Sequence, residues 1–183
     1  NASDELVDNY EDEGDLRKQF YLVPEYGYTP VCYLAVNKCM FLGESIPSDD
    51  KFMLALRLSE AYLILAEATA KTDPMIALNA VNELRKKRIS EEKYKDKSGL
   101  SGDELLEFVR NERRRELCFE GHRWFDLRRY GMPSFTRVWK EGGVPAKWFT
   151  MEKEDAAYTL PISKEVMDRN PGLIQNRLGN PKY

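Results

Sequence analysis

The stretch from Glu112 to Tyr130 constrains the fold more than any other part of the chain, because it combines dense charge with large aromatic residues. Between Arg110 and Arg129 the sequence has seven arginines against four acidic residues, which leaves the segment a net charge of +3. Large aromatic residues such as Phe119, Trp124 and Phe125 are not typical of a solvent-exposed helix, and an ordinary core helix does not carry so many ionised groups. The segment therefore either buries paired charges or presents a basic surface to a partner.

The order of the residues favours buried ion pairs. Leu105, Phe108, Glu112 and Glu116 recur at helical spacing, so a face that begins apolar becomes ionic without changing direction. We expect this face to point inward and its carboxylates to pair with arginines. Losing one partner of such a buried pair costs about 3–5 kcal/mol, so we expect the network to hold the helices in register.

A second charged stripe lies on the strongest predicted helix, Phe52 to Lys71. Arg57, Glu60 and Glu67 share one face of this otherwise apolar helix, which indicates a specific polar partner rather than solvent. The expected network joins Glu112, Glu116 and Asp126 to Arg57, Arg113, Arg123 and Arg129, and Glu60 or Glu67 to arginines of the charged stretch.

Two alternatives fit the charged stretch less well. A nucleic-acid or phosphate surface uses arginines and interleaved aromatics, but it would not place Glu112, Glu116 and Asp126 among its contacts. A catalytic site could pair Glu112 with Glu116 or use His122 as a base. Neighbouring arginines would keep both carboxylates ionised, so neither suits a general acid, and no nucleophile lies near His122 in the sequence. We predict no catalytic residues and no nucleic-acid partner.

The bulk properties fit one compact domain of 183 residues with an apolar fraction of 42%. Residues 1–15 are acidic and poor in hydrophobic residues, so we expect an extended or poorly ordered lead-in, followed by a helical domain over residues 16–183. The net charge of −3 is not that of a general polyanion binder. No apolar run approaches the roughly 18 residues that a membrane span needs.

The cysteines and the single histidine predict no metal site and no cofactor. Cys118 lies within an apolar helical pattern and is expected to be a small core residue. Cys32 and Cys39 could pair if the chain doubles back, although two free thiols are the simpler interpretation. One histidine and no CxxC motif make a zinc site improbable.

Two helical hairpins are predicted around the charged stretch. The helix from Phe52 to Lys71 is apolar nearly all round, which is typical of a helix buried between others. Asp73 and Pro74 form a helix start signal, and the second helix runs to about Ile89 with Ala77, Val81 and Leu84 facing inward. A third helix begins at Ser101, where Glu104 would complete a capping box, and Gly121 interrupts it before a helix that ends near Tyr130.

The remaining segments are predicted to be short strands and loops. Phe20 to Pro24 and Pro30 to Val36 read as two extended runs, with a small β-hairpin as one arrangement, and Phe41 to Lys51 reads as a loop. Residues 132–157 contain Gly-Gly and two prolines and are expected to be irregular. Ser163 is the predicted N-cap of a short helix that Asn170 and Pro171 end.

Five motifs in this order resemble the SusD/RagB family of outer-membrane nutrient-binding lipoproteins. They are RLSEAYLILAEA (Arg57 to Ala68), ALNAVNELRKKR (Ala77 to Arg88), ERRRELCFEGHRWFDLRRYG (Glu112 to Gly131), LPI (Leu160 to Ile162) and NPGLIQN (Asn170 to Asn176). The resemblance begins near Asp15, and it covers only the C-terminal portion of the longer family pattern.

The resemblance implies a mainly all-α fold, with tetratricopeptide-like helical hairpins, long irregular loops and a small β-hairpin. It also implies a protein without catalysis that binds oligosaccharides at the cell surface. Its implied partner is a SusC-like TonB-dependent outer-membrane transporter, over which the SusD-like protein sits as a lid. Membrane association would come only from an N-terminal lipid anchor that is absent from this chain.

Trp139 and Trp148 are the candidate ligand-binding residues, with Phe149 and Tyr28 as weaker ones. A glycan site needs exposed aromatic platforms, and these residues fall in segments predicted to be irregular. The simpler interpretation is that they pack the loop onto the helices. The alternative function is a helical scaffold part that docks a protein partner and has no ligand site of its own.

Overall fold

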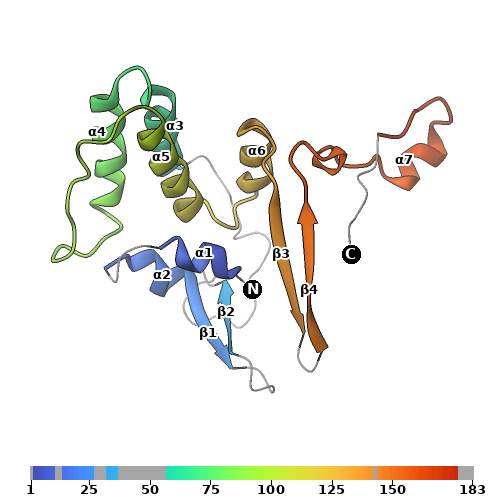
Figure 1. Cartoon of the computed structure of the whole chain (residues 1–183), viewed down its shortest axis with the longest axis horizontal. Helices are drawn as coiled ribbons and strands as arrows, with labels where there is room; N and C mark the ends of the chain where they lie inside the picture. Colours follow the sequence, from blue (N-terminus) through green and yellow to red (C-terminus); the bar gives the residue numbers. More distant parts are fainter. Residues whose placement is uncertain (1, 11–13, 27–31, 37–56, 142–143, 177–183) are drawn as a thin grey trace. The chain divides into compact units, whose positions relative to one another are not determined.

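Helices dominate the part of the chain that the structure describes. The structure is a computed structural model, and it describes residues 2–10, 14–26, 32–36, 57–141 and 144–176 (Figure 1). Two antiparallel hairpins, each of two strands, complete the regular structure of these residues. The prediction of a mainly helical fold is confirmed. The chain separates into two compact units, Asn1–Arg123 and Trp124–Tyr183, and each is described by itself.

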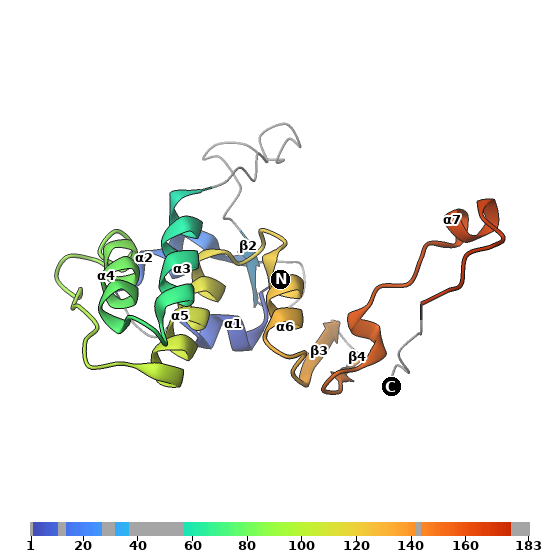
Figure 2. The same ribbon diagram turned by 90° about the horizontal axis from the view of Figure 1, so that it is seen from above.

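The first unit is built on a pair of antiparallel helices, α3 (Leu58–Thr69) and α4 (Pro74–Arg85). Asp73 caps α4, because its side chain accepts a hydrogen bond from the backbone N–H of Ile76 at 3.2 Å, and Pro74 occupies the first helical turn. The predicted start of this helix is confirmed. A third helix, α5 (Gly102–Glu116), packs against both members of the pair (Figures 1 and 2).

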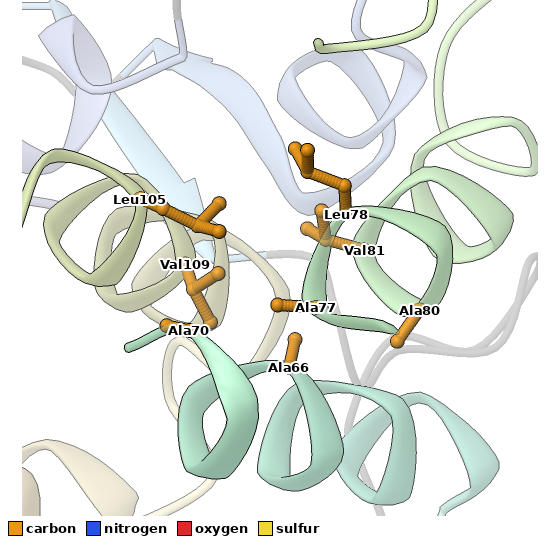
Figure 3. Packing of buried hydrophobic residues seen from close by; sticks show 8 residues of the cluster. All are labelled: Ala66, Ala70, Ala77, Leu78, Ala80, Val81, Leu105 and Val109. Atoms are coloured by element: carbon orange, nitrogen blue, oxygen red, sulfur yellow. The ribbon is translucent and has the colours of Figure 1, made fainter. Parts of the chain in front are cut away.

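Small side chains form the core where these three helices meet. Figure 3 shows Ala66 and Ala70 of α3 and Ala77 of α4 on the side of Val109 of α5, between the helices. Short side chains let helix axes approach closely, and inserting a larger residue there costs typically about 1–3 kcal/mol. The buried members of this cluster are Ala66, Ala70, Ala77, Leu78, Ala80, Val81, Leu105 and Val109.

Helix α3 is not buried on all sides, contrary to the prediction from its apolar composition. Leu63 and Ala66 are fully buried, whereas Leu58, Ile64 and Leu65 are 72%, 55% and 45% exposed. The described residues cover one face of the helix with α4 and α5, and they leave the opposite apolar face in solvent. Residues 52–56, the start of the predicted helix, lie outside the described residues.

The acidic start of the chain is more ordered than we predicted. Instead of an extended lead-in, Ser3 caps a short helix, α1 (Asp4–Asp8), by accepting a hydrogen bond from the N–H of Leu6 at 3.3 Å. Leu6 and Tyr10 are buried against Cys118, which is a small core residue as predicted, and the hydroxyl of Tyr10 lies 3.5 Å from its Sγ. These two hydrophobic residues provide enough apolar contact to order the segment.

A backbone bridge holds the next segment beside the end of α4. Asp15 pairs with Ile89, and the N–H of Ser90 donates to the carbonyl of Gly14 at 2.9 Å. A side chain at Gly14 would lie 2.5 Å from the Cβ of Lys93, so the close approach requires glycine. Asp15 then caps α2 (Leu16–Tyr21).

The small β-hairpin is confirmed near the predicted position. Strand β1 (Leu22–Tyr26) pairs with β2 (Cys32–Val36) in antiparallel register. Phe20 and Tyr21, which we assigned to the first strand, instead end α2. The connecting residues with Tyr28, the loop from Phe41 to Lys51, and Cys39 lie outside the described residues, so the pairing of Cys32 with Cys39 stays a prediction.

Two residues predicted as helix N-caps occupy that position, but their side chains make no capping hydrogen bond. Ser101 occupies the N-cap position of α5, but its side chain makes no capping hydrogen bond, so the predicted capping box with Glu104 does not form. Ser163 likewise precedes α7 (Lys164–Arg169) without a capping hydrogen bond from its side chain. Both residues have the extended backbone of an N-cap, which alone accounts for the helix start.

The second unit contains a β-hairpin where we predicted irregular chain. After α6 (His122–Arg129), strand β3 (Phe135–Glu141) pairs with β4 (Val144–Met151) in antiparallel register (Figure 1). The β-branched and aromatic residues of these strands favour extended structure and outweigh Pro145, which lies within β4, while Gly142 and Gly143 lie outside the described residues. The 3₁₀ turn η2 (Ala156–Tyr158) and α7 follow.

Candidate functional site

The buried carboxylate Glu112 is held by three arginines. Its oxygens lie 2.6 Å from Nη1 of Arg17, 2.7 Å from Nη2 of Arg115 and 3.1 Å from Nη1 of Arg85. Glu112 is fully buried, and Arg17 also binds Asp15 at 2.7 Å. The arrangement confirms that the inward face of α5 is ionic, and it draws partners from α2 and α4 as well as from α5 itself.

Glu116, one helical turn later, has its own arginine cluster. Arg88 binds both of its carboxylate oxygens, at 2.9 and 3.0 Å, and Arg57 approaches at 3.2 Å. Arg57 also binds Glu120 at 2.6 Å and donates to the backbone carbonyl of Glu116. Two-point contacts of this kind fix the orientation of both groups.

These environments keep both carboxylates ionised. Burial alone would raise the pKa of Glu112, but the charges of Arg17, Arg115 and Arg85 outweigh it and lower the pKa to about 2. The pKa of Glu116 is also lowered, because the hydrogen bond and charge of Arg88 and the charges of Arg17 and Arg57 outweigh burial. Neither group can donate a proton near neutral pH, so the pair has a structural role rather than that of a general acid.

Four of the predicted ion pairs are present. Arg57 pairs with Glu116, Arg113 with Glu60 at 3.5 Å, Arg110 with Glu67 at 3.4 Å and Arg129 with Asp126 at 3.0 Å. His122, considered as a base, lies with Nδ1 3.7 Å from Oε1 of Glu60.

Sequence reasoning missed half of the network. Arg17, Arg85, Arg88 and Arg115 supply most of the direct contacts to Glu112 and Glu116, and none was assigned a partner in advance. A usable signal was present in Asp15 and Arg17, since an acid and an arginine two residues apart at a helix start can pair locally. Arg85 ends α4 and Arg88 follows three residues later, where a basic side chain is equally well explained by the helix dipole, so the sequence gives no local signal of their inward direction.

The two candidate tryptophans occupy neighbouring strands of the β3–β4 hairpin. Trp139 is 60% exposed and Trp148 is 61% exposed, so most of each side chain is open to solvent. Trp139 lies directly across from Lys147, and Trp148 lies directly across from Val138. Opposed residues share a face and successive residues alternate, so the two rings point to opposite faces of the hairpin.

The base of the hairpin is anchored by a buried aromatic residue. The ring of Tyr158 stacks on Trp124 with centroids 5.2 Å apart and meets the edge of Phe135 at 6.3 Å. The hydroxyl of Tyr158, whose side chain is fully buried, donates to the carbonyl of Pro133 at 2.5 Å. Trp124 is therefore a packing residue, while Trp139 and Trp148 extend beyond the anchor.

Neither a metal cluster nor a membrane helix is found where the structure can be described. Among these residues, no group of three or more histidine, cysteine, aspartate or glutamate side chains is arranged to hold a metal ion. In the same residues, no helix has both the length and the apolar character needed to cross a bilayer.

A model of the SusD family matches residues 43–183, which is more than half of the chain. The chain belongs to the SusD family. Members of the SusD family are non-catalytic binding proteins. The matched region includes α3, α4, α5 and the β3–β4 hairpin, so Glu112, Glu116 and the candidate tryptophans lie within it, whereas Asp15 and Arg17 precede it.

Two relatives are SusD-like proteins, and both are much longer than this chain. SusD-like protein P2 of Formosa agariphila is 31% identical over 137 residues, which are 71% of this chain and 26% of the relative. SusD-like protein P38 of the same organism is 32% identical over 100 residues, which are 51% of this chain and 20% of that relative. The chain thus spans about a quarter of the length of the relatives it matches.

One solved structure shares the fold. A SusD-like carbohydrate binding protein from Bacteroides vulgatus ATCC 8482 superposes with a TM-score of 0.63 over 94% of this chain and 41% of its own. Because the two sequences are 20% identical, the similarity concerns the fold alone. The arrangement of helices and hairpins described above is therefore a SusD-like fold.

Proposed function

We propose that this chain binds an oligosaccharide, without catalysis, as part of nutrient uptake at the cell surface. The observation that carries the proposal is the exposure of Trp139 and Trp148, about 60% each, on a hairpin whose base is fixed by Tyr158. Exposed tryptophans are costly to leave in water, and a sugar ring offers them an apolar face with hydroxyls at its edge. The carbohydrate binding named for the Bacteroides vulgatus relative supports the same ligand class.

The transporter partner and the location at the outer membrane are also proposals. A SusC-like TonB-dependent outer-membrane transporter would be the protein partner, with the SusD-like protein covering it as a lid. An N-terminal lipid anchor on the full-length protein would hold it at the outer surface of the outer membrane. Family membership supports both statements, and co-purification of the full-length protein with a SusC-like transporter from detergent-solubilised outer membranes tests them.

Glycan-affinity electrophoresis tests the ligand proposal. The chain is run through native gels that contain starch, xylan, xyloglucan or homogalacturonan, beside gels without polysaccharide. We expect slower migration in at least one polysaccharide and a loss of retardation in Trp139→Ala, Trp148→Ala or both. Trp124→Phe preserves a ring beside Tyr158 and should migrate as the wild type does. Unchanged retention of both alanine variants would refute the proposed site.

The exposed apolar face of α3 favours a second candidate function. Leu58, Ile64 and Leu65 form an uncovered surface in the first unit, and such surfaces commonly contact another protein. In that case this part of the protein is a docking scaffold without a ligand site of its own. A glycan array on this chain and on the full-length protein separates the two candidates, since binding by the longer protein alone would favour docking.

A further inference from the structure

Four side chains form a block on the face of the β3–β4 hairpin that carries Trp148. Val138 lies directly across from Trp148, and Thr136 lies directly across from Thr150. The two pairs are two residues apart on each strand and the register between them is continuous, so all four side chains share one face. Farther along β3, the side chain of Lys140 lies outside the described residues, so the block is defined by these four residues alone.

One half of the block is an apolar platform. The side chains of Trp148 and Val138 are both exposed, so the indole ring and the methyl groups beside it reach solvent. Directly opposed residues have Cβ atoms about 4.5–5.5 Å apart, so Val138 widens the apolar surface next to the indole. A ligand ring with C–H groups on one side can lie on this surface and shield it from water.

The other half of the block is a pair of hydroxyl groups. The Oγ1 atoms of Thr136 and Thr150 lie 2.9 Å apart and share a hydrogen bond across the strands. Each hydroxyl can donate one hydrogen bond and accept others, so the pair keeps a donor and several lone pairs for a ligand. Thr136 is exposed and Thr150 is half-buried, and the restricted χ1 angles of β-branched side chains hold the two hydroxyls in place.

The distance between the two halves suits a sugar ring. Alternate residues along a strand are roughly 7 Å apart, and diagonal neighbours across the ladder are about 7–8 Å apart. A pyranose that lies with its C–H groups on Trp148 therefore directs hydroxyls at its edge toward Thr136 and Thr150. Two gauche hydroxyls on neighbouring carbons have nearly the separation of two hydrogen-bonded hydroxyls, so each Oγ1 can meet one of them.

We propose that the Trp148 face binds a sugar residue with two free hydroxyls on neighbouring carbons, the ring on the indole and the hydroxyl pair at Thr136 and Thr150. This inference rests on the proposed glycan-binding function and specifies its ligand class. The two threonines are then specificity-determining residues, because a sugar that lacks one of the hydroxyls leaves a hydrogen bond of the complex unmade.

Linkage isomers of one polysaccharide test the inference in affinity gels. Inner residues of β-1,4-xylan keep neighbouring hydroxyls free, whereas the linkage of β-1,3-xylan blocks one of them and leaves no adjacent pair. Xyloglucan, with a β-1,4-glucan backbone, and laminarin, which is mainly β-1,3-glucan, make a second comparison. Mobility at several polymer concentrations gives the apparent affinity. We expect stronger retention on the β-1,4 member of at least one comparison.

The variants separate the hydroxyl pair from the ring. The double variant Thr136→Val/Thr150→Val keeps β-branched side chains in both strands and removes both hydroxyls. It should weaken retention on the β-1,4 polymer about two- to ten-fold and leave retention on the β-1,3 polymer unchanged. Thr159→Val removes a hydroxyl elsewhere in the second unit and should have no effect. Trp148→Ala should weaken retention further, and Trp139→Ala should keep the preference for the β-1,4 member.

The outcomes separate the hydroxyl-pair inference from the glycan-binding function. Equal or stronger retention on the β-1,3 member of both comparisons overturns the inference while glycan binding stands. Starch and homogalacturonan also keep neighbouring hydroxyls free, so unchanged retention of the double valine variant on whichever of these polymers binds the chain overturns it too. Retention that depends on Trp139 and not on Trp148 has the same consequence. Absence of retention on every polymer refutes both statements.

Discussion

Arg17 of α2 and Glu112 of α5 form an ion pair in which both side chains are almost completely buried, with Nη1 and Oε1 2.6 Å apart. The pair joins the N-terminal segment to the third helix of the helical core, and Asp15 and Glu116 share the same guanidinium. Leaving either charge without its partner in this environment is expensive. The stability of the first unit should therefore depend on this contact more than on any exposed ion pair.

Arg17→Ala should lower the free energy of unfolding by about 3–5 kcal/mol, because it leaves Glu112 and Asp15 with fewer compensating charges. Lys71→Ala is the matched control, since Lys71 pairs with Asp103 at 2.5 Å where the two side chains are 56% and 88% exposed. An exposed pair contributes about 0–1 kcal/mol. Urea denaturation followed by circular dichroism gives both values, and equal losses would contradict the structural role of the buried network.

The free energy of unfolding should fall in acid through Glu112. Its pKa is lowered in the folded chain from the ordinary value of 4.5 to about 2, so its contribution is present above about pH 4.5 and is lost as the pH falls toward 2. The contribution is of the order of a few kcal/mol. Glu112→Gln should be less stable at pH 7 and show a shallower decline between pH 5 and 2. A variant with the wild-type slope would exclude Glu112 as the source.

Removing the Arg113–Glu60 contact should lower the melting temperature without a local effect on binding. Arg113 is buried and its Nη2 lies 3.5 Å from Oε1 of Glu60. Arg113→Ala or Glu60→Ala leaves the other, largely buried charge without this contact, which costs about 1–3 kcal/mol and shifts the melting temperature by roughly 2–12 °C for a chain of this size. A wild-type melting curve for either variant would refute the contribution of this pair.

Neighbouring residues of α3 should differ sharply in their effect on stability. Leu63 is fully buried, so Leu63→Ala should cost about 2–5 kcal/mol through lost contacts and a cavity. Ile64 is 55% exposed, and Ile64→Ala should cost less than about 1 kcal/mol. Chemical denaturation of both variants gives the comparison, and similar costs would show that the second face of α3 is covered in solution.

The helical core could be predicted from the sequence because its signals are local. The cap at Asp73 and Pro74 and the inward positions of Ala77 and Val81 follow from spacing and backbone chemistry alone. The inward turn of the charged stretch could also be predicted, since Glu112 and Glu116 continue an apolar stripe.

The remaining features depend on contacts between distant segments. Arg17 acquires its role only when α2 comes to lie beside α5, and no spacing rule within the sequence describes that approach. The β3–β4 hairpin was not predicted, because Gly-Gly and two prolines in residues 132–157 indicate irregular chain, whereas the pairing of β3 with β4 depends on contacts across the strands. Without the register of that hairpin, the placement of Trp139 and Trp148 on opposite faces could not be inferred.

The most direct test of glycan binding through the hairpin is the retention of the double variant Trp139→Ala/Trp148→Ala. It removes one exposed ring from each face and leaves the aromatic anchor of Phe135 and Tyr158 in place. Affinity electrophoresis against the polysaccharides that retain the wild type is the measurement, with a matching thermal melt to verify folding. We predict a folded variant that is no longer retained. A folded variant with wild-type retention would contradict the account.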